Sequence, residues 1–366
     1  MKITVAKEEL QSKLSNIQNI VEKKNTMPIL SHFLLDARKK GAFIVATDLE
    51  TAMKEPLQVR IEKEGQICIP ARKMFEIIKE VDGDVRCETI DDQWMKIKVG
   101  KSNFRLACLS SGEFPAWPGM EDKEEISIEA DLLKDVIEKT IYAAGESDTR
   151  YTLNGLLFHL TSGVTITVVG TDGHRLAIIS KQIQGTINEE KKLIVPKKAA
   201  AELRKIIEKS SETVKVTLDK NHVLFTVGKI EFLTRLIEGT YPSYEQVIPA
   251  HNENKIIVNR EAFTKSLRRV AIMSKERSNA VKVDISNNLF SITSSNPDIG
   301  EAQDELPVEY KGEQITMGFN ARYFIDILEG MSDEKITLEI QAALNPVLIR
   351  GEKNENYRCV IMPMRI

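Results

Sequence analysis

The chain has 366 residues, of which 42% are hydrophobic and 29% charged, and its formal net charge is −3. These proportions are typical of a soluble globular protein, and no apolar run approaches the roughly 18 residues needed to cross a bilayer. The opening segment Met1–Val5 alternates like a strand rather than a signal peptide, so we expect a cytoplasmic protein without a membrane partner.

Three copies of one succession of elements are predicted along the chain. Each copy opens with an alternating strand that runs into an amphipathic helix, at Ile3, Ile126 and Ile256. The copies, which we call modules, are spaced by about 125 residues, long enough for each to bury its own core. We therefore predict three domains, 1–122, 123–252 and 253–366, divided in the polar stretches Gly119–Glu125 and Pro249–Lys255.

Further strands follow in each module, and one of them ends in a small polar triplet. Alternation predicts strands at Phe33–Asp36, Val164–Val169, Val214–Leu218 and Val281–Ile285. The triplets are Ala46–Asp48, Gly170–Asp172 and, less closely, Ser294–Asn296. Because strands dominate and no strand–helix–strand succession with long crossovers appears, the predicted fold class is α+β with antiparallel sheets.

Each module then contains a short helix in which a basic residue precedes an acid by four positions. The pairs are Arg72 and Glu76, Lys198 and Glu202, and Arg322 and Asp326. A corner with an aromatic residue before proline follows at Phe114–Pro115 and Tyr241–Pro242, and Met362–Pro363 resembles it. If equivalent modules contact each other in the same way, the two ends of the chain keep complementary free faces, which predicts a closed, ring-shaped oligomer.

Basic residues gather at the starts of the short helices, where the helix dipole disfavours a cation by up to about 1 kcal/mol. They are Arg72, Lys73, Lys197, Lys198 and Arg322, and the segment Arg260–Arg277 is also rich in base. One interpretation is contact with a polyanion, most simply the phosphates of duplex DNA, since no aromatic-rich stretch indicates stacking on single strands. The alternative is a solvated surface on a protein-binding hub.

No strong catalytic, cofactor or metal motif is present. The five histidines lack the spacing of a helical metal site, and there is no phosphate-binding glycine loop or nucleophile elbow. The four cysteines lie singly in apolar stretches, so we expect buried thiols. Asp172 and His174 are the best candidate acid/base pair, and the alternative is a turn in which Asp172 bonds the local backbone and Gly173 takes a positive φ.

The C-terminal segment Val360–Ile366 is apolar, whereas chain ends are usually polar. We expect its first half to form a final strand. Met364 and Ile366 lie beyond what that strand requires, and methionine is common at adaptable binding surfaces, so a groove for a partner's peptide is predicted here.

Several segments together resemble the bacterial DNA polymerase III β subunit family, the replicative sliding clamps. The segments are Asn25–Leu30, Arg150–Gly155, Thr171–Leu176, Tyr241–Pro242 and Met362–Arg365, and the resemblance spans the whole chain. It implies three DNA-clamp domains per chain and a head-to-tail homodimeric ring, with helices lining a central hole around double-stranded DNA and sheets outside. It also implies no catalytic activity and no cofactor.

The same resemblance implies partners and site residues. Partners would be the DNA polymerase III catalytic subunit, the clamp loader, other polymerases, ligase and mismatch-repair proteins, which bind through a short linear peptide of the QLxLF kind. The implied pocket for that peptide comprises Arg150, Leu153, Thr171, Gly173, His174, Arg175, Leu176, Pro242, Val247, Asn320, Tyr323, Val360, Met362, Pro363 and Met364. The implied DNA contacts are Lys24, Arg72, Lys73, Tyr151, Lys197 and Lys198. Gln246 and Pro346 depart from the best-known members, which predicts a shifted peptide preference.

Overall fold

The computed structural model describes residues 1–21, 27–120, 124–161, 163–187, 189–208, 213–249, 254–274 and 278–365. By their contacts the residues form two compact units, Met1–Asp131 with Glu202–Leu236, and Leu132–Ala201 with Ile237–Ile366. The predicted module boundaries are therefore not the boundaries of these units, and they stay a prediction. Helices α3 (Ala130–Ile141) and α4 (Lys197–Ile207) each contain a point where the chain passes from one unit to the other.

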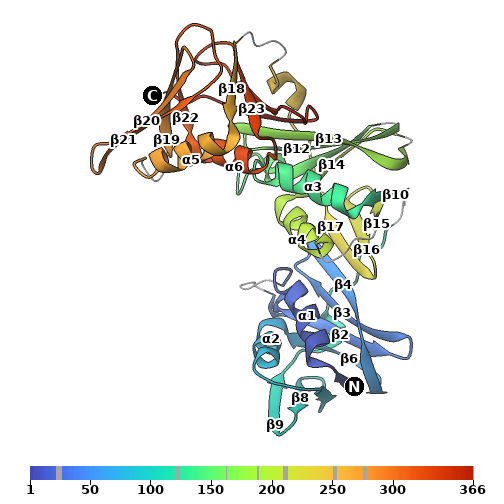
Figure 1. The fold of residues 1–366 in the computed structure, drawn as a ribbon. Coiled ribbons are helices and arrows are strands. Elements are labelled where there is room, and N and C mark those ends of the chain that lie inside the picture. Colours follow the sequence, from blue (N-terminus) through green and yellow to red (C-terminus); the bar gives the residue numbers. More distant parts are fainter. Residues whose placement is uncertain are drawn as a thin grey trace. The chain divides into compact units, whose positions relative to one another are not determined.

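The first unit contains two antiparallel sheets (Figure 1). The smaller sheet consists, in spatial order, of β5 (Val59–Lys63), β1 (Lys2–Val5), β7 (Val85–Thr89), β8 (Trp94–Val99) and β9 (Ser102–Ala107). The larger consists of β10 (Glu124–Glu129), β15 (Thr213–Leu218), β16 (His222–Val227), β17 (Ile230–Arg235), β4 (Thr51–Leu57), β3 (Gly41–Thr47), β2 (His32–Arg38) and β6 (Gly65–Pro70). The unit's helices are α1 (Lys7–Ile17), α2 (Ala71–Lys79) and the short 3₁₀ turns η1 (Pro28–Ser31) and η2 (Ser111–Glu113).

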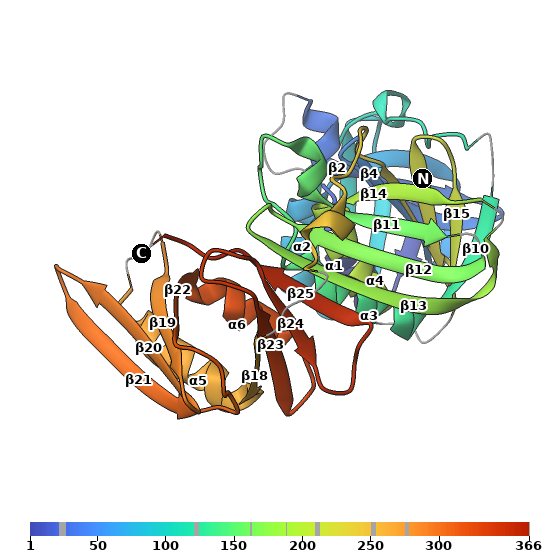
Figure 2. The same ribbon diagram turned by 90° about the horizontal axis from the view of Figure 1, so that it is seen from above.

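The second unit also contains two antiparallel sheets. The larger, which Figure 2 shows with β11, β12 and β13 side by side, consists of β14 (Lys191–Pro196), β11 (Gly155–Thr161), β12 (Gly163–Thr171), β13 (Arg175–Ile187), β25 (Tyr357–Ile361), β24 (Val347–Gly351), β23 (Lys335–Ile340) and β18 (Asn254–Asn259). The smaller consists of β21 (Gly300–Pro307), β20 (Leu289–Asn296), β19 (Ala280–Ser286) and β22 (Ile315–Asn320). The remaining helices are α5 (Arg260–Ala271), α6 (Ala321–Glu329), η3 (Tyr151–Asn154) and η4 (Tyr244–Val247).

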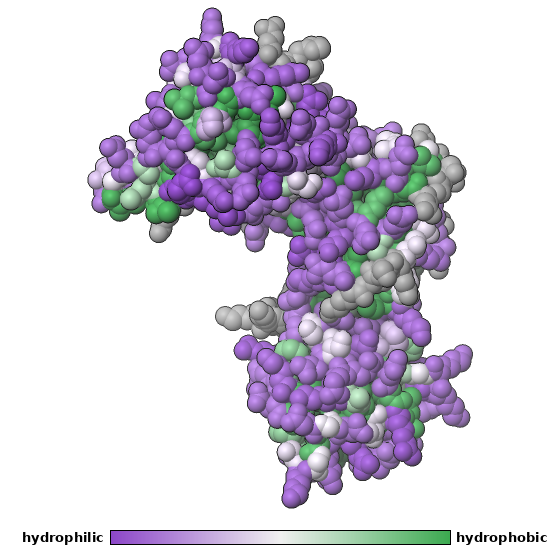
Figure 3. Space-filling view, in the orientation of Figure 1, coloured by the Kyte–Doolittle hydropathy of each residue, from purple (hydrophilic) through white to green (hydrophobic). Residues whose placement is uncertain are grey.

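The predicted strand and helix periodicities are confirmed. Strands β2 and β3 alternate between buried and less buried residues, as expected for sheets with one face on the core. Helix α1 buries Leu10, Leu14 and Ile17, which lie on one face at spacings of three and four. Hydrophilic residues cover most of the surface seen in Figure 3.

The core of the C-terminal module is built on aromatic rings. Phe263 of α5 meets Phe290 of β20 and Phe324 of α6 edge to face, with centroids 5.0 and 5.3 Å apart. Such pairs add about 0.5–1.5 kcal/mol to the free energy that burial itself contributes. Helices α5 and α6 are thereby fixed on one face of the four-stranded sheet.

Each eight-stranded sheet joins strands from two sequence modules. In the first unit β17 pairs with β4, with Phe232 opposite Met53. In the second unit β13 pairs with β25, with Leu176 opposite Val360. Sequence patterns predicted the strands but not these partners, because pairing across modules depends on the three-dimensional arrangement.

The cysteine prediction is also confirmed. All four thiols are free and buried, and burial raises the pKa of three of them, Cys68, Cys87 and Cys108, to about 12 and that of Cys359 to about 11. Within the described part of the chain, no helix is long and apolar enough to span a membrane.

Candidate functional site

The turn between β12 and β13 is held by its own side chains. The Thr171 hydroxyl donates to the Arg175 carbonyl at 2.6 Å and accepts from the Gly173 amide at 3.1 Å. The Asp172 carboxylate accepts from the amides of His174 and Arg175 at 2.9 and 3.0 Å. Gly173 has a φ of +83°, and a Cβ there would lie 2.7 Å from Nη1 of Arg150, so glycine meets both the backbone and the packing requirement.

The corresponding turn of the first module has the same construction. The Thr47 hydroxyl donates to the Thr51 carbonyl, and Asp48 accepts from the amides of Glu50 and Thr51. A shared pattern of backbone contacts shows that the aspartate organises the turn in both modules. The interpretation of Asp172 as a turn residue is therefore confirmed, and the alternative of an Asp172–His174 acid/base pair is wrong.

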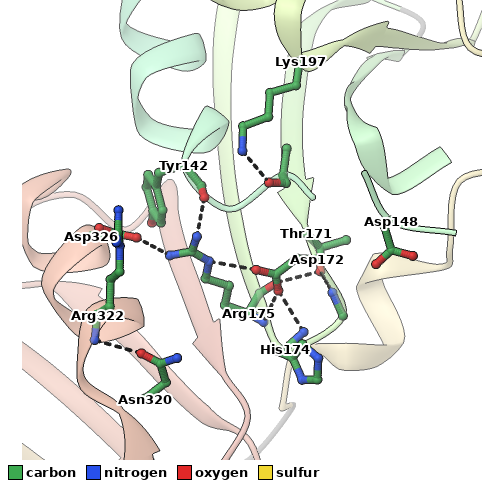
Figure 4. A network of polar contacts seen from close by, with 12 residues as sticks. Tyr142, Asp148, Thr171, Asp172, His174, Arg175, Lys197, Asn320, Arg322 and Asp326 are labelled. Carbon is green, nitrogen blue, oxygen red and sulfur yellow. Dashed lines mark hydrogen bonds and ion pairs between the residues drawn. The ribbon is translucent and has the colours of Figure 1, made fainter. Parts of the chain in front are cut away.

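Arg175 is the centre of a polar network beside this turn (Figure 4). Its guanidinium donates to Asp172 at 3.0 Å, to Asp326 of α6 at 2.5 Å and to the Tyr142 carbonyl at 2.5 Å. The same group lies over the rings of Tyr142 and Tyr323. Only 11% of the side chain is exposed, so these contacts tie the turn, the end of α3 and α6 together at a site shielded from water.

A small pocket of about 110 Å³ opens beside the turn. It is lined by Arg150, Leu153, Thr171, Gly173, Arg175, Leu176, Pro242, Tyr244, Val247, Val360 and Met362, and we call it the apolar pocket. Drug-sized ligands need about 300–1,000 Å³, whereas this volume suits an apolar side chain. Its walls consist of methyl groups and rings together with one exposed cation, Arg150. Such a lining is suited to binding a ligand rather than to catalysis.

Ten of the fifteen predicted pocket residues line this apolar pocket, and the other five do not. His174 and Tyr323 lie next to it, with their rings stacked at 6.5 Å. Asn320 caps α6 by accepting from the Arg322 amide at 2.9 Å, which gives Asn320 a structural role. Pro363 follows Met362, outside the lining.

Met364 lies elsewhere than predicted. Its amide donates to the Gly318 carbonyl at 2.8 Å, so the tail adds a bridge to the edge of β22. Its side chain borders a different hollow on the four-stranded sheet. The first half of the tail forms the final strand β25, as predicted, and Met364 lies beyond the end of that strand. The groove for a partner's peptide at this end stays a prediction, and Ile366 lies outside the described residues.

Tyr244 is the lining residue that sequence reasoning missed. It is buried in a cluster with Leu157, Leu176 and Val360, and its side chain forms part of the wall of the apolar pocket. An aromatic residue two positions after Pro242, in a segment already singled out, was the available signal.

The basic residues of α2 are paired within the helix. Arg72 and Lys73 both contact Glu76, at 3.1 and 2.6 Å, and the Lys73 hydrogen bond is the main reason that the pKa of Glu76 is lowered. Such exposed ion pairs contribute little to stability. Because two cations share one carboxylate, the start of α2 still has a net positive charge.

The basic residues of α4 differ from each other. Lys197 is half-buried and donates to the Ala144 carbonyl at 2.8 Å, and burial lowers the pKa of its ammonium group. Lys198 is exposed, and Tyr151 on η3 is 75% exposed. Lys24 lies outside the described residues.

The basic segment of α5 is largely neutralised. Lys265 pairs with Glu261, Arg268 with Glu329 and Arg269 with Asp304. Arg260 donates to the carbonyls of Asp333 and Leu328. The described part of this segment thus gives no support to the DNA interpretation; Lys275 and Arg277 lie outside it.

The whole chain is similar to known sliding clamps. Residues 1–118, 127–243 and 245–365 match the N-terminal, central and C-terminal domain families of the DNA polymerase III beta subunit. The beta sliding clamp of Pseudomonas aeruginosa is 31% identical over 368 residues, with each chain fully covered.

Solved structures agree over the same length. The DNA polymerase III subunit beta of Bartonella birtlesii, crystallised with griselimycin, is 34% identical with a TM-score of 0.95, and each chain is fully covered. The polymerase sliding clamp of Bacillus subtilis is 28% identical with a TM-score of 0.94, covering 100% of this chain and 99% of that one. The three-domain clamp fold and the order of the three families leave one assignment: this chain belongs to the DNA polymerase III beta subunit family, the beta sliding clamps.

Proposed function

We propose that two copies of this chain close into a ring that encircles duplex DNA and tethers DNA polymerase III and other replication and repair proteins to it. The carrying observation is the similarity to sliding clamps over the full chain, with all three domain families in order. Members of the family are non-catalytic subunits, which agrees with the structural role of Asp172. The protein would act in the cytoplasm.

Encirclement has a direct test. Retention would come from topology, while phosphate contacts stay weak enough for sliding. The clamp, loaded by a clamp loader on nicked circular DNA, should stay bound, and linearising the circle should release it. Equal loss from circular and linear DNA would contradict the proposal.

Ring closure is supported by two strands at sheet edges. β9 lies at one edge of the five-stranded sheet, and β21 at one edge of the four-stranded sheet. β8 and β9 carry Lys96, Lys98 and Arg105, whereas β21 carries Glu301 and Glu305. An exposed edge is a template for pairing with another chain, and the opposite charges favour β9 of one copy beside β21 of the next.

The solution mass tests this closure. Light scattering should give twice the chain mass of 41.3 kDa. Arg105→Glu should shift the equilibrium toward monomer, and combining it with Glu305→Arg should restore dimer. A monomeric wild type, or a double variant no better than the single one, would contradict the pairing.

For DNA contact we propose Arg72, Lys73, Tyr151, Lys197 and Lys198, together with Lys24. Lys197 would have to leave the Ala144 carbonyl to reach a phosphate, so its contribution should be smaller than that of Lys198. Charge reversal at Arg72 and Lys73 should weaken DNA binding and flatten its salt dependence. Unchanged loading would instead favour the protein-binding hub with merely solvated helices.

The apolar pocket is our proposed site for the short peptides of partners: the polymerase catalytic subunit, the clamp loader, other polymerases, ligase and mismatch-repair proteins. Its apolar walls suit the leucine and aromatic side chains of such a peptide. Fluorescence anisotropy with a labelled QLxLF-type peptide should show much weaker binding to Met362→Ala than to the matched control Met364→Ala, because only Met362 lines the pocket. Equal effects would count against the assignment.

A further inference from the structure

One wall of the apolar pocket is formed by η4, in which Tyr244 is the buried residue. Tyr244 and Val247 of η4 line the apolar pocket. Tyr244 and its neighbour Glu245 also border two further hollows, of about 440 and 290 Å³. Because open space borders η4 at these hollows, its position depends on the contacts that the buried Tyr244 side chain makes.

The Tyr244 side chain provides such a contact. Its hydroxyl lies 2.9 Å from Nδ1 of His159, a buried residue of β11. Nε2 of the same imidazole lies 2.8 Å from Glu190 Oε1. Tyr244, His159 and Glu190 therefore form a continuous chain of hydrogen bonds from the pocket wall to the surface.

The sheet register places His159 under this wall. On β11, His159 is two residues from Leu157, which belongs to the apolar cluster around Tyr244. His159 pairs with Lys192 of β14 and with Thr167 of β12. Because residues two apart share a sheet face, His159 belongs to the surface that η4 covers.

Hydrogen-bonding capacity fixes the direction of the chain. An ionised Glu190 carboxylate only accepts, so the imidazole carries a proton on Nε2, and in the tautomer with that proton alone Nδ1 presents a lone pair. Nδ1 and the Glu245 carboxylate are then the two acceptors available to the single proton of the Tyr244 hydroxyl, whose pKa is raised mainly by burial. Lys192 pairs with Glu190 at 3.2 Å. The charged groups that act on the tyrosine are Glu245, which also hydrogen-bonds its hydroxyl, Arg358 and Glu190.

We propose that His159 and Glu190 are positioning residues for partner binding: through the Tyr244 hydroxyl they hold η4 as a wall of the apolar pocket. The proposal rests on the proposed function of that pocket. Neither residue lines the pocket, so their effect on a bound peptide must pass through Tyr244.

Two substitutions remove the hydrogen bond between Tyr244 and His159, and a third should retain it. Tyr244→Phe keeps the ring in the pocket wall and loses only the hydroxyl, and His159→Leu removes its partner. Each should weaken binding of a labelled QLxLF-type peptide about three- to tenfold, the usual size of one neutral hydrogen bond. His159→Asn places an amide where Nδ1 was and should restore most of the affinity. His159→Gln, which reaches toward Glu190 instead, should not.

A double variant tests the route. If His159 acts only through the Tyr244 hydroxyl, His159→Leu should cause no further loss of affinity in the Tyr244→Phe background. Additive losses, or equal affinities of the Asn and Gln variants, would overturn the positioning role. Melting temperatures of all variants separate a loss of fold from a loss of affinity.

Met362→Ala distinguishes this inference from the proposed function. If Met362→Ala weakens peptide binding while Tyr244→Phe and His159→Leu leave it unchanged, the positioning role is wrong and the pocket assignment stands. If the wild type binds no peptide, or Met362→Ala has no effect, the pocket assignment itself fails, and the inference fails with it.

Discussion

Replacing Arg175 with methionine should destabilise the second unit, because the Asp326 carboxylate would lose the guanidinium that now neutralises its charge. Methionine keeps an unbranched stem beside the apolar pocket but loses three hydrogen bonds. Asp172 keeps its two backbone donors. Asp326, with 24% of its side chain exposed, loses its ion-pair partner.

The size of the effect follows from the environment of Asp326. Removing one partner of a fully buried pair costs about 3–5 kcal/mol, and the partial exposure of Asp326 reduces this to about 2–3 kcal/mol. For a unit of this size, each kcal/mol lowers the melting temperature by about 2–4 °C, so a fall of about 5–10 °C is expected. Urea denaturation followed by circular dichroism gives the free energy, and differential scanning fluorimetry gives the temperature.

A second substitution shows whether the unpaired carboxylate is the cause. Asp326→Asn alone should destabilise the wild type, because it removes the ion pair. In the Arg175→Met background the same substitution should stabilise, because it removes an uncompensated charge. If Asp326→Asn destabilises both backgrounds equally, the reasoning from charge burial is refuted.

Three further predictions follow from the turn, its neighbouring ion pair and the thiols. Gly173→Ala should cost about 1–2 kcal/mol and weaken peptide binding, because alanine strains at positive φ and displaces Arg150; unchanged urea midpoints would contradict this. The pKa of Asp148 is lowered to about 2, first by its hydrogen bond from the Arg150 side chain, so this contact contributes stability above about pH 4 and loses it as pH falls toward 2. Carboxyl ¹³C NMR should show that low value and its return toward 3.8 in Arg150→Ala, and no change would disprove the cause. The native protein should not react with a maleimide at pH 8, whereas the unfolded chain should label at all 4 thiols; fast native labelling would contradict their burial.

Sequence patterns predicted the helices and strands well because the periodic spacing of apolar residues is a local property of the chain. The strand and helix that begin each module, and the Asp172 turn, depend on residues close together in sequence. Tyr244 follows Pro242 closely, but its hydrogen bond to His159, 85 positions away, depends on the sheet register and could not be predicted from the sequence. Met364 was predicted to line the peptide pocket for the same reason: its backbone bridge to Gly318 joins residues far apart in sequence and cannot be predicted from composition.

Charge was harder to interpret than periodicity. The spacing of Arg72 and Lys73 from Glu76 allows either residue to pair with it, and in the structure both contacts are formed at once. For Lys197 nothing in the sequence indicated the Ala144 carbonyl. A basic residue at a helix start can thus be used within the fold, and its charge alone does not identify a DNA contact.

The ladders that join strands of different modules have a mechanical consequence. Pulling module 1 from module 2 would require breaking the β17–β4 hydrogen bonds, and pulling module 2 from module 3 would require breaking those of β13–β25. Separating two sequence modules that share a sheet would thus cost a whole ladder of backbone hydrogen bonds, whereas the chain passes between the two compact units within α3 and α4, where neither ladder lies.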